Sequence, residues 1–186
     1  VFHLDRSYLA AFYLHQCYIG LFNPIIQLFV LFLSSLFKRL EMKVHYGVEN
    51  IEIKCPVVTI GSFDGVHLGH ACVIQHLKEK AADMDGESVI ISFEPHPREV
   101  LYPREQKIGI LTTLEEKIAI LEKYGVDHLI ILKFTLEFAQ QSYNDFVKKV
   151  LIDKLKIKGL VVGYDHRFGK DRAGNFENLQ ELANEY

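Results

Sequence analysis

Short apolar runs alternate with longer segments in which apolar residues recur every three or four positions, from residue 57 onward. The short runs are rich in Val and Ile, which is typical of buried parallel strands, and the longer segments are typical of amphipathic helices. The pattern predicts strands over residues 57–61, 88–93, 128–132 and 159–163. It predicts helices over residues 68–84, 113–124 and 142–156.

Local signals mark the ends of some of these helices. Thr113 and Glu116 have the spacing of a capping box, and Gly125 stands where that helix should end. Asn175 is a candidate N-cap for a last helix. The expected core residues of the helix over residues 142–156 are Phe146, Val150 and Leu155.

The alternating order of strands and helices predicts an α/β fold. Right-handed βαβ units produce a parallel sheet with helices on both faces. Ligands of such sheets bind beyond the carboxyl ends of the strands. Because the segments rich in Gly and His all follow predicted strands, we expect them to meet at one rim of the sheet.

The first forty residues differ from the rest of the chain. Residues 17–37 contain no charged residue and are long enough to span a bilayer, and Lys38 and Arg39 would then place the downstream domain in the cytoplasm. No small-residue cleavage site follows, which argues against secretion. An ordinary globular composition begins at Met42. We therefore expect residues 1–41 to be a non-native upstream translation and residues 42–186 to be the functional domain; a membrane anchor is the alternative.

The overall composition excludes some classes of function. The 186 residues are 49% hydrophobic and carry a net charge of −3, which argues against a polybasic nucleic-acid-binding protein. The cysteines Cys17, Cys55 and Cys72 have neither disulfide-like nor ligand-like spacing. They indicate a reducing, cytoplasmic setting.

The strongest chemical signal is the segment TIGSFDGVHLGH at residues 59–70. Glycines after a strand let the backbone approach a phosphate, and the N-terminus of the following helix presents free N–H groups. His67 and His70 are three residues apart, so both rings lie on one face of that helix. Together they can donate hydrogen bonds to a phosphoryl group that gains charge in a transition state. Taken singly, either histidine could be an ordinary surface or core residue. The two histidines could also bind a metal, but no third ligand stands at a matching spacing.

This segment resembles the signature of the nucleotidyltransferase superfamily, Gly-x-Phe-Asp-x-x-His-x-Gly-His. The resemblance implies a Rossmann-like fold and nucleotidyl transfer without a covalent enzyme intermediate. It implies that His67 and His70 are catalytic, contacting the ATP phosphates and stabilising the pentacoordinate phosphorus. The ATP-binding residues that it implies are Gly61, Ser62, Phe63, Asp64 and Gly69.

Two further segments, SFEPHP at residues 92–97 and VVGYDHRFGKDRAG at residues 161–174, look like the FMN adenylyltransferase domain of bacterial bifunctional riboflavin kinase/FAD synthetases. The implied reaction converts ATP and FMN into FAD and pyrophosphate, with Mg²⁺ accompanying ATP and no metal held by the protein alone. The FMN-binding residues that the resemblance implies are Phe93, Pro95, His96, Pro97, Asp165, Arg167 and Arg172. One departure is His166, where the family commonly has Phe.

The residues themselves leave other interpretations of these segments open. Arg167 and Arg172 could hold phosphates or belong to a solvated basic loop, and Asp165 could orient FMN, approach Mg²⁺ or cap a turn. Phe93 could stack on the flavin or pack in the core. Pro95 could shape a pocket wall or simply stiffen a loop.

In the family that the chain resembles, a Ser-Ser/Thr-x-Ile-Arg motif and a riboflavin kinase domain follow the part matched here. We therefore expect residues 42–186 to be a truncated domain of a longer cytoplasmic protein, with little activity alone. Its expected partners are ATP, FMN and the missing kinase domain. Binding to a membrane is expected only if residues 17–37 are native.

Three other functions remain open from the sequence. One is a different small nucleotidyltransferase, such as a pantetheine-phosphate adenylyltransferase or a cytidylyltransferase. Another is a non-catalytic module that binds a nucleotide or flavin. A metal hydrolase using several of the 9 histidines is less favoured, because the histidines lack ligand spacing.

Overall fold

The computed structural model describes residues 41–102, 109–163 and 179. The chain separates into two units, Val1–Leu40 and Glu41–Tyr186. The first unit lies outside the described residues, so the expected boundary after residue 41 and the nature of residues 17–37 stay predictions. Across the part that the structure does describe, no helix combines the length and the apolar character needed to cross a bilayer.

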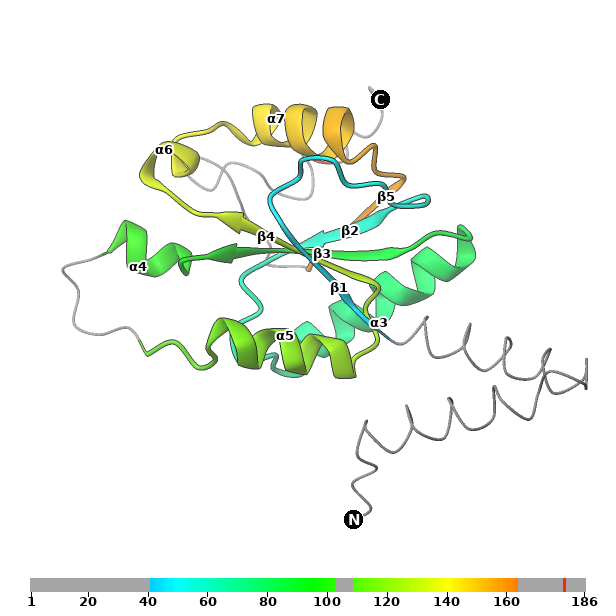
Figure 1. The fold of residues 1–186 in the computed structure, drawn as a ribbon, viewed down its shortest axis with the longest axis horizontal. Coiled ribbons are helices and arrows are strands. Elements are labelled where there is room, and N and C mark those ends of the chain that lie inside the picture. Colours follow the sequence, from blue (N-terminus) through cyan, green and yellow to red (C-terminus); the bar gives the residue numbers. More distant parts are fainter. Residues whose placement is uncertain (1–40, 103–108, 164–178, 180–186) are drawn as a thin grey trace, which may run out of the picture. The chain divides into compact units, whose positions relative to one another are not determined.

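A parallel sheet of five strands, in the order β1-β4-β3-β2-β5, forms the centre of the second unit (Figure 1). All four pairings between neighbouring strands are parallel. The strands are β1 Lys43–Tyr46, β2 Val57–Ile60, β3 Ser88–Glu94, β4 His128–Lys133 and β5 Gly159–Val161. From β2 the chain continues to β3 and β4 on one side, whereas β5 returns to the other side of β2. The switch point of this topology, where α/β proteins bind ligands, therefore lies between β2 and β5.

Helices cover both faces of the sheet. Helices α3 Leu68–Asp83 and α5 Leu114–Lys123 lie on one face, and α7 Tyr143–Phe146 continues into the π-helix η2 Val147–Lys154 on the other (Figure 1). Two short helices, α4 Pro97–Leu101 and α6 Leu136–Ala139, follow β3 and β4.

Alternate strand residues supply two separate cores, as the two-residue period of a strand requires. Val57 and Ile90 pack with Ile74 and Leu77 of α3 on one face. The residues that alternate with these along each strand point to the other face, where they pack against α7 and η2. That second core includes Val58, Ile60, Val89, Ile91, Ile130, Phe146 and Leu151.

The sequence-based expectations for the fold are largely confirmed. The predicted parallel α/β sheet is present, and each of the four predicted strands and three predicted helices has a counterpart. Thr113 and Glu116 form the predicted capping box, and Gly125 adopts a φ of 68° at the end of α5. Among the expected core residues, Phe146 and Leu155 are buried and Val150 is half-buried.

Some details of the fold differ from the expectation. Strand β1 was not predicted, and the segment over residues 142–156 is mostly a π-helix, with one short α-helical turn before it. Strand β5 ends at Val161, two residues earlier than expected. The predicted cap Asn175 lies outside the described residues.

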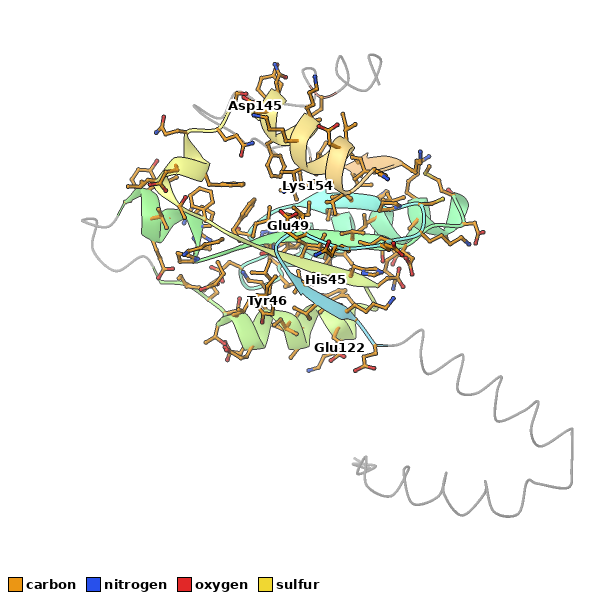
Figure 2. All side chains as sticks on the ribbon, turned by 45° about the horizontal axis from the view of Figure 1, so that its top comes forward. His45, Tyr46, Glu49, Glu122, Asp145 and Lys154 are labelled. Carbon is orange, nitrogen blue, oxygen red and sulfur yellow. The ribbon has the colours of Figure 1, made fainter. Side chains whose placement is uncertain are left out.

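Two interactions connect elements far apart in the sequence. His45 of β1 and His128 of β4 stack, with Nε2 and Nδ1 2.9 Å apart, and Glu87 lies 3.4 Å from Nε2 of His128. Burial lowers the pKa of His128, although Glu87 acts in the opposite direction. An exposed ion pair joins Lys154 of η2 to Glu49 of the loop after β1 (Figure 2). Such exposed pairs contribute less than about 1 kcal/mol each.

Candidate functional site

The turn that leaves β2, with the sequence GSFDGV, has an unusual backbone. Phe63 and Val66 adopt positive φ angles of 49° and 36°, and Gly65 has φ 67°. A Cβ atom on Gly61 would lie 3.0 Å from Cε2 of Phe63, so glycine allows the phenyl ring to fold back against the strand end. The turn directs the chain from the rim of the sheet into the first turn of α3.

An aromatic stack stands at the start of α3. Phe63 is 2% exposed, and its ring lies 4.9 Å from the ring of His70. The rings of His70 and His67 are stacked, with centroids 3.7 Å apart and planes 18° apart. The structure therefore brings the two predicted catalytic histidines together, with Phe63 as the buried support of the pair.

His67 is also the N-cap of α3. Its Nδ1 accepts a hydrogen bond from the backbone N–H of His70 at 3.3 Å. Because Nδ1 is an acceptor, a neutral His67 carries its proton on Nε2, which is then a donor. A Cβ atom on Gly69 would lie 3.1 Å from Cε1 and Nδ1 of His67. Glycine at position 69 thus leaves room for the imidazole ring of His67.

His70 has a buried nitrogen that makes no hydrogen bond within the described residues. This atom is Nδ1. Burial and the neighbouring His67 lower the pKa of His70, whereas Asp64 acts in the opposite direction. A phosphate placed against His70 would favour the protonated form of this residue, since an opposite charge nearby stabilises the charged state.

Asp64 connects the turn to a second loop. Its carboxylate accepts hydrogen bonds from the backbone N–H groups of Leu111 and Thr112, both at 2.9 Å, and from the Thr112 hydroxyl at 3.0 Å. Partial burial raises the pKa of Asp64, but these hydrogen bonds outweigh it and the pKa is lowered. Gly65 donates its N–H to the same hydroxyl. The carboxylate therefore holds the two loops together, a role that the sequence did not reveal.

His96 caps helix α4. Its Nδ1 accepts a hydrogen bond from the backbone N–H of Arg98 at 3.2 Å, and its own N–H donates to Glu99 at 3.1 Å. Pro97 occupies the first turn of α4, and the Glu94–Pro95 peptide bond is cis. Burial lowers the pKa of His96. The segment over residues 94–97 is thus a rigid corner at the end of β3.

Phe93, expected to contact FMN, belongs to an aromatic cluster. Its ring packs edge-on against Phe134 at 5.6 Å and lies tilted against Phe138 at 5.7 Å, and Phe138 in turn contacts Phe146. This placement matches the alternative of a core aromatic residue. Contact between Phe93 and a flavin stays a prediction.

Sequence reasoning missed one buried residue at this rim, Lys117 of α5. Its side chain is 3% exposed, and its Nζ donates a hydrogen bond to the hydroxyl of Ser92 at 3.3 Å. That hydroxyl donates to the backbone carbonyl of Ser62 at 3.1 Å. A signal was available, because Lys117 stands between Leu114 and Leu121 on the apolar face of the helix.

The remaining expectations for the site concern a metal and the segment after β5. Asp165, Arg167 and Arg172 lie outside the described residues. Within the described residues no three His, Cys, Asp or Glu side chains gather as metal ligands. The rim can thus present a histidine pair and the start of a helix to a phosphate, next to the switch point of the sheet.

Comparisons with known proteins agree with this geometry. Residues 50–186 match the family model of FAD synthetase. The chain is 38% identical over 147 residues to the "Bifunctional riboflavin kinase/FMN adenylyltransferase" of Buchnera aphidicola subsp. Acyrthosiphon pisum, covering 78% of this chain and 47% of that protein. For the protein of the same name from Haemophilus influenzae the identity is 39% over 129 residues, covering 69% and 42%.

A solved structure is similar as well. It is described as a macrolide-efflux protein from Streptococcus pneumoniae, with a TM-score of 0.65 and 25% identity, covering 75% of this chain and 47% of that one. The chain spans about half the length of the curated relatives it matches. With the signature segment, the parallel sheet and the family match in agreement, the chain belongs to the FAD synthetase family.

Proposed function

We propose that this chain carries the site that transfers the adenylyl group of ATP to FMN, forming FAD and pyrophosphate, and that it does so alone at a low but measurable rate. The observation that carries the proposal is the stacked pair His67 and His70 at the N-terminus of α3, beside the switch point of the sheet. Family membership and the names of the relatives support FMN as the acceptor.

The reaction is a single displacement at phosphorus. A phosphate oxygen of FMN forms a bond to the α-phosphorus of ATP while the bond from that phosphorus to the bridging oxygen breaks, and pyrophosphate leaves. His67 and His70 donate hydrogen bonds to the oxygens that gain charge, and the first N–H groups of α3 add to this field. The protein mainly positions the two substrates and stabilises charge.

Mg²⁺ is proposed to arrive with ATP. The Asp64 carboxylate is already engaged by Leu111 and Thr112, which leaves it a poor metal ligand. Phosphate oxygens and water are the natural ligands of Mg²⁺ at such a site, where it would neutralise the charge of the leaving pyrophosphate.

FMN is proposed to lie along the ends of β3 and β5, against the rigid corner formed by Pro95, His96 and Pro97. Asp165, Arg167 and Arg172 are proposed to complete its site, with Phe93 near the flavin ring. In the longer protein a riboflavin kinase domain would supply FMN, as the names of the bifunctional relatives suggest. We place the reaction in the cytoplasm, in keeping with the free thiols of Cys55 and Cys72.

The test is FAD formation by the purified protein from ATP and FMN, followed by chromatography with pyrophosphate measured in parallel. His67→Asn and His70→Asn should each lower kcat by about 100-fold or more, as loss of a transition-state donor does. His76→Asn is the matched control, because this exposed histidine of the same helix hydrogen-bonds the Cys72 carbonyl of its own helix and lies outside the histidine stack. Binding of FMN without any turnover would instead favour the non-catalytic module, and turnover with phosphopantetheine in place of FMN would favour the other nucleotidyltransferase.

A further inference from the structure

Lys117 is a buried cation whose place in the fold calls for an explanation. The side chain comes from α5, is 3% exposed, and makes one hydrogen bond within the described residues, to Ser92. An ammonium group has three donors, and its removal from water is costly unless the group is well paired. A methionine of similar length would fit this apolar face of α5 without that cost.

The hydrogen bond from Lys117 to Ser92 is continued by a second one, from Ser92 to the turn after β2. The direction of donation is the same in both. An ammonium can only donate, so the Ser92 oxygen is the acceptor and the hydroxyl proton is left for the Ser62 carbonyl. Without Lys117 the Ser92 oxygen loses the donor that orients it, and the bond to the Ser62 carbonyl is left to hold the hydroxyl alone. The lysine therefore holds the Ser62 carbonyl through Ser92.

The Ser62 carbonyl belongs to the peptide group that leads into Phe63. Phe63 has the positive φ of 49°, and its ring supports His70. Rotation of the peptide between residues 62 and 63 would turn the phenyl ring and with it the stacked histidines. A continuous series of contacts thus runs from α5, through β3, to the histidine pair.

Several charged and titratable groups surround Lys117. Burial lowers the pKa of Lys117, while Glu94 of β3 and Asp64 of the turn act in the opposite direction. In return, the charge of Lys117 is one of the influences that lower the pKa of His96. The pKa of His96 can therefore report whether the lysine is charged.

We propose that Lys117 is a positioning residue of the adenylyl-transfer site, holding the Ser62–Phe63 peptide through Ser92 so that His70 stays stacked on His67. The inference rests on the proposed function for its kinetic readout, but its structural readout is independent of that function. It assigns a catalytic purpose to a residue outside the signature segment and on a different helix.

The variants are Lys117→Met, Ser92→Ala and the double variant, with Lys117→Arg as the conservative change and Lys123→Met as an exposed control on the same helix. In the purified full chain, Lys117→Met should lower kcat by about tenfold while KM for FMN changes by less than about threefold. The melting temperature should stay equal or rise, because a buried charge has been replaced by an apolar group. Lys117→Arg should recover part of the lost kcat, and Lys123→Met should change nothing.

The double variant tests the series of contacts itself. If Lys117 acts through Ser92, the double variant should be no slower than the slower single variant, whereas multiplied losses would overturn the proposal. A lower melting temperature with an unchanged kcat would also overturn it, since that is the signature of a purely structural lysine.

The NMR spectrum of the histidine rings provides the structural readout. In Lys117→Met the ring signals of His67 and His70 should shift and the pKa of His96 should rise, compared with the wild type and Lys123→Met. Unchanged ring signals would overturn the proposal even if the wild type made no FAD. Absence of FAD from the wild type, together with the expected shifts, would refute the proposed function and leave the positioning role intact.

Discussion

Replacement of Gly69 by Ala should separate the stability of this protein from its activity. Gly69 is the second residue of α3, and its φ is outside the left-handed region, so alanine adds no backbone strain. In a helix interior, alanine is favoured over glycine by about 0.8–1.0 kcal/mol, and somewhat less is expected in a first turn. The backbone term alone therefore predicts a slightly more stable protein.

The new methyl group acts against His67. The Cβ atom would lie 3.1 Å from Cε1 and Nδ1 of that ring, whereas ordinary contacts begin at about 3.5 Å. The ring must retreat by about 0.4 Å, and an off-rotamer side chain costs about 0.5–1.5 kcal/mol. The two terms nearly cancel, so the free energy of unfolding should change by less than about 1 kcal/mol.

Activity should respond much more strongly than stability. The displaced ring shifts within its 3.7 Å stack on His70, and its 3.3 Å capping hydrogen bond lengthens. A misplacement of about 1 Å can reduce a rate by about 100-fold, so a shift of about half that size should lower kcat by about tenfold. Steady-state FAD formation and urea denaturation measure the two quantities on the same preparation. Gly109→Ala is the control, because no atom of the described residues lies within 4 Å of its Cβ position. A wild-type kcat in Gly69→Ala would refute the idea that the histidine stack sets the rate.

Three other changes test the rest of the rim and the sheet. Gly65→Ala should lower the free energy of unfolding in urea by about 1–2 kcal/mol, because its φ is 67° and its Cβ would lie 2.7 Å from Leu111; an unchanged value would contradict the turn geometry. Asp64→Asn should weaken the hydrogen bonds from Leu111 and Thr112. The free energy of unfolding should then fall by about 1–2 kcal/mol, and the rate of FAD formation should fall as well. Full activity would refute the idea that Asp64 holds the two loops together. In His128→Asn, the melting temperature should fall less steeply than in the wild type as the pH drops below about 6.5. Burial lowers the pKa of His128 in the folded chain, so the unfolded chain binds the proton first and acid destabilises the wild type; an equal slope in the variant would assign the loss to other groups.

Locally encoded features were predictable from the sequence. Strand β2 is recognisable as four consecutive β-branched residues, Val57 to Ile60, and the start of α5 depends on Thr113 and Glu116, which lie only three residues apart. His67 and His70 also meet as their spacing suggested, although through a cap: His67 is the extended N-cap of α3 and accepts a hydrogen bond from the N–H of His70, three residues further on. In each case the interacting partners are within one turn or one strand of each other.

Features that depend on distant partners were not predictable in this way. Strand β1 has four residues and pairs with β4, more than 80 residues away in sequence, as the register of Lys43 with His128 shows. The role of Asp64 depends on Leu111 and Thr112, 47 and 48 residues further along. A sequence pattern indicates that a residue is polar and placed near a rim, but the identity of its partner comes only from the packed sheet.

The three glycines of the signature segment can now be explained by one requirement. In each case a Cβ atom would meet a side chain of the same rim: Phe63 for Gly61, Leu111 for Gly65 and His67 for Gly69. A phosphate-binding role alone would require glycine only where the backbone must approach the ligand. Here the glycines also make room for the phenyl ring, the second loop and the first imidazole. The segment is therefore best understood as the support of two stacked histidines. Substitution of Gly61 or Gly69 should alter the arrangement of the rings before it alters the affinity for ATP.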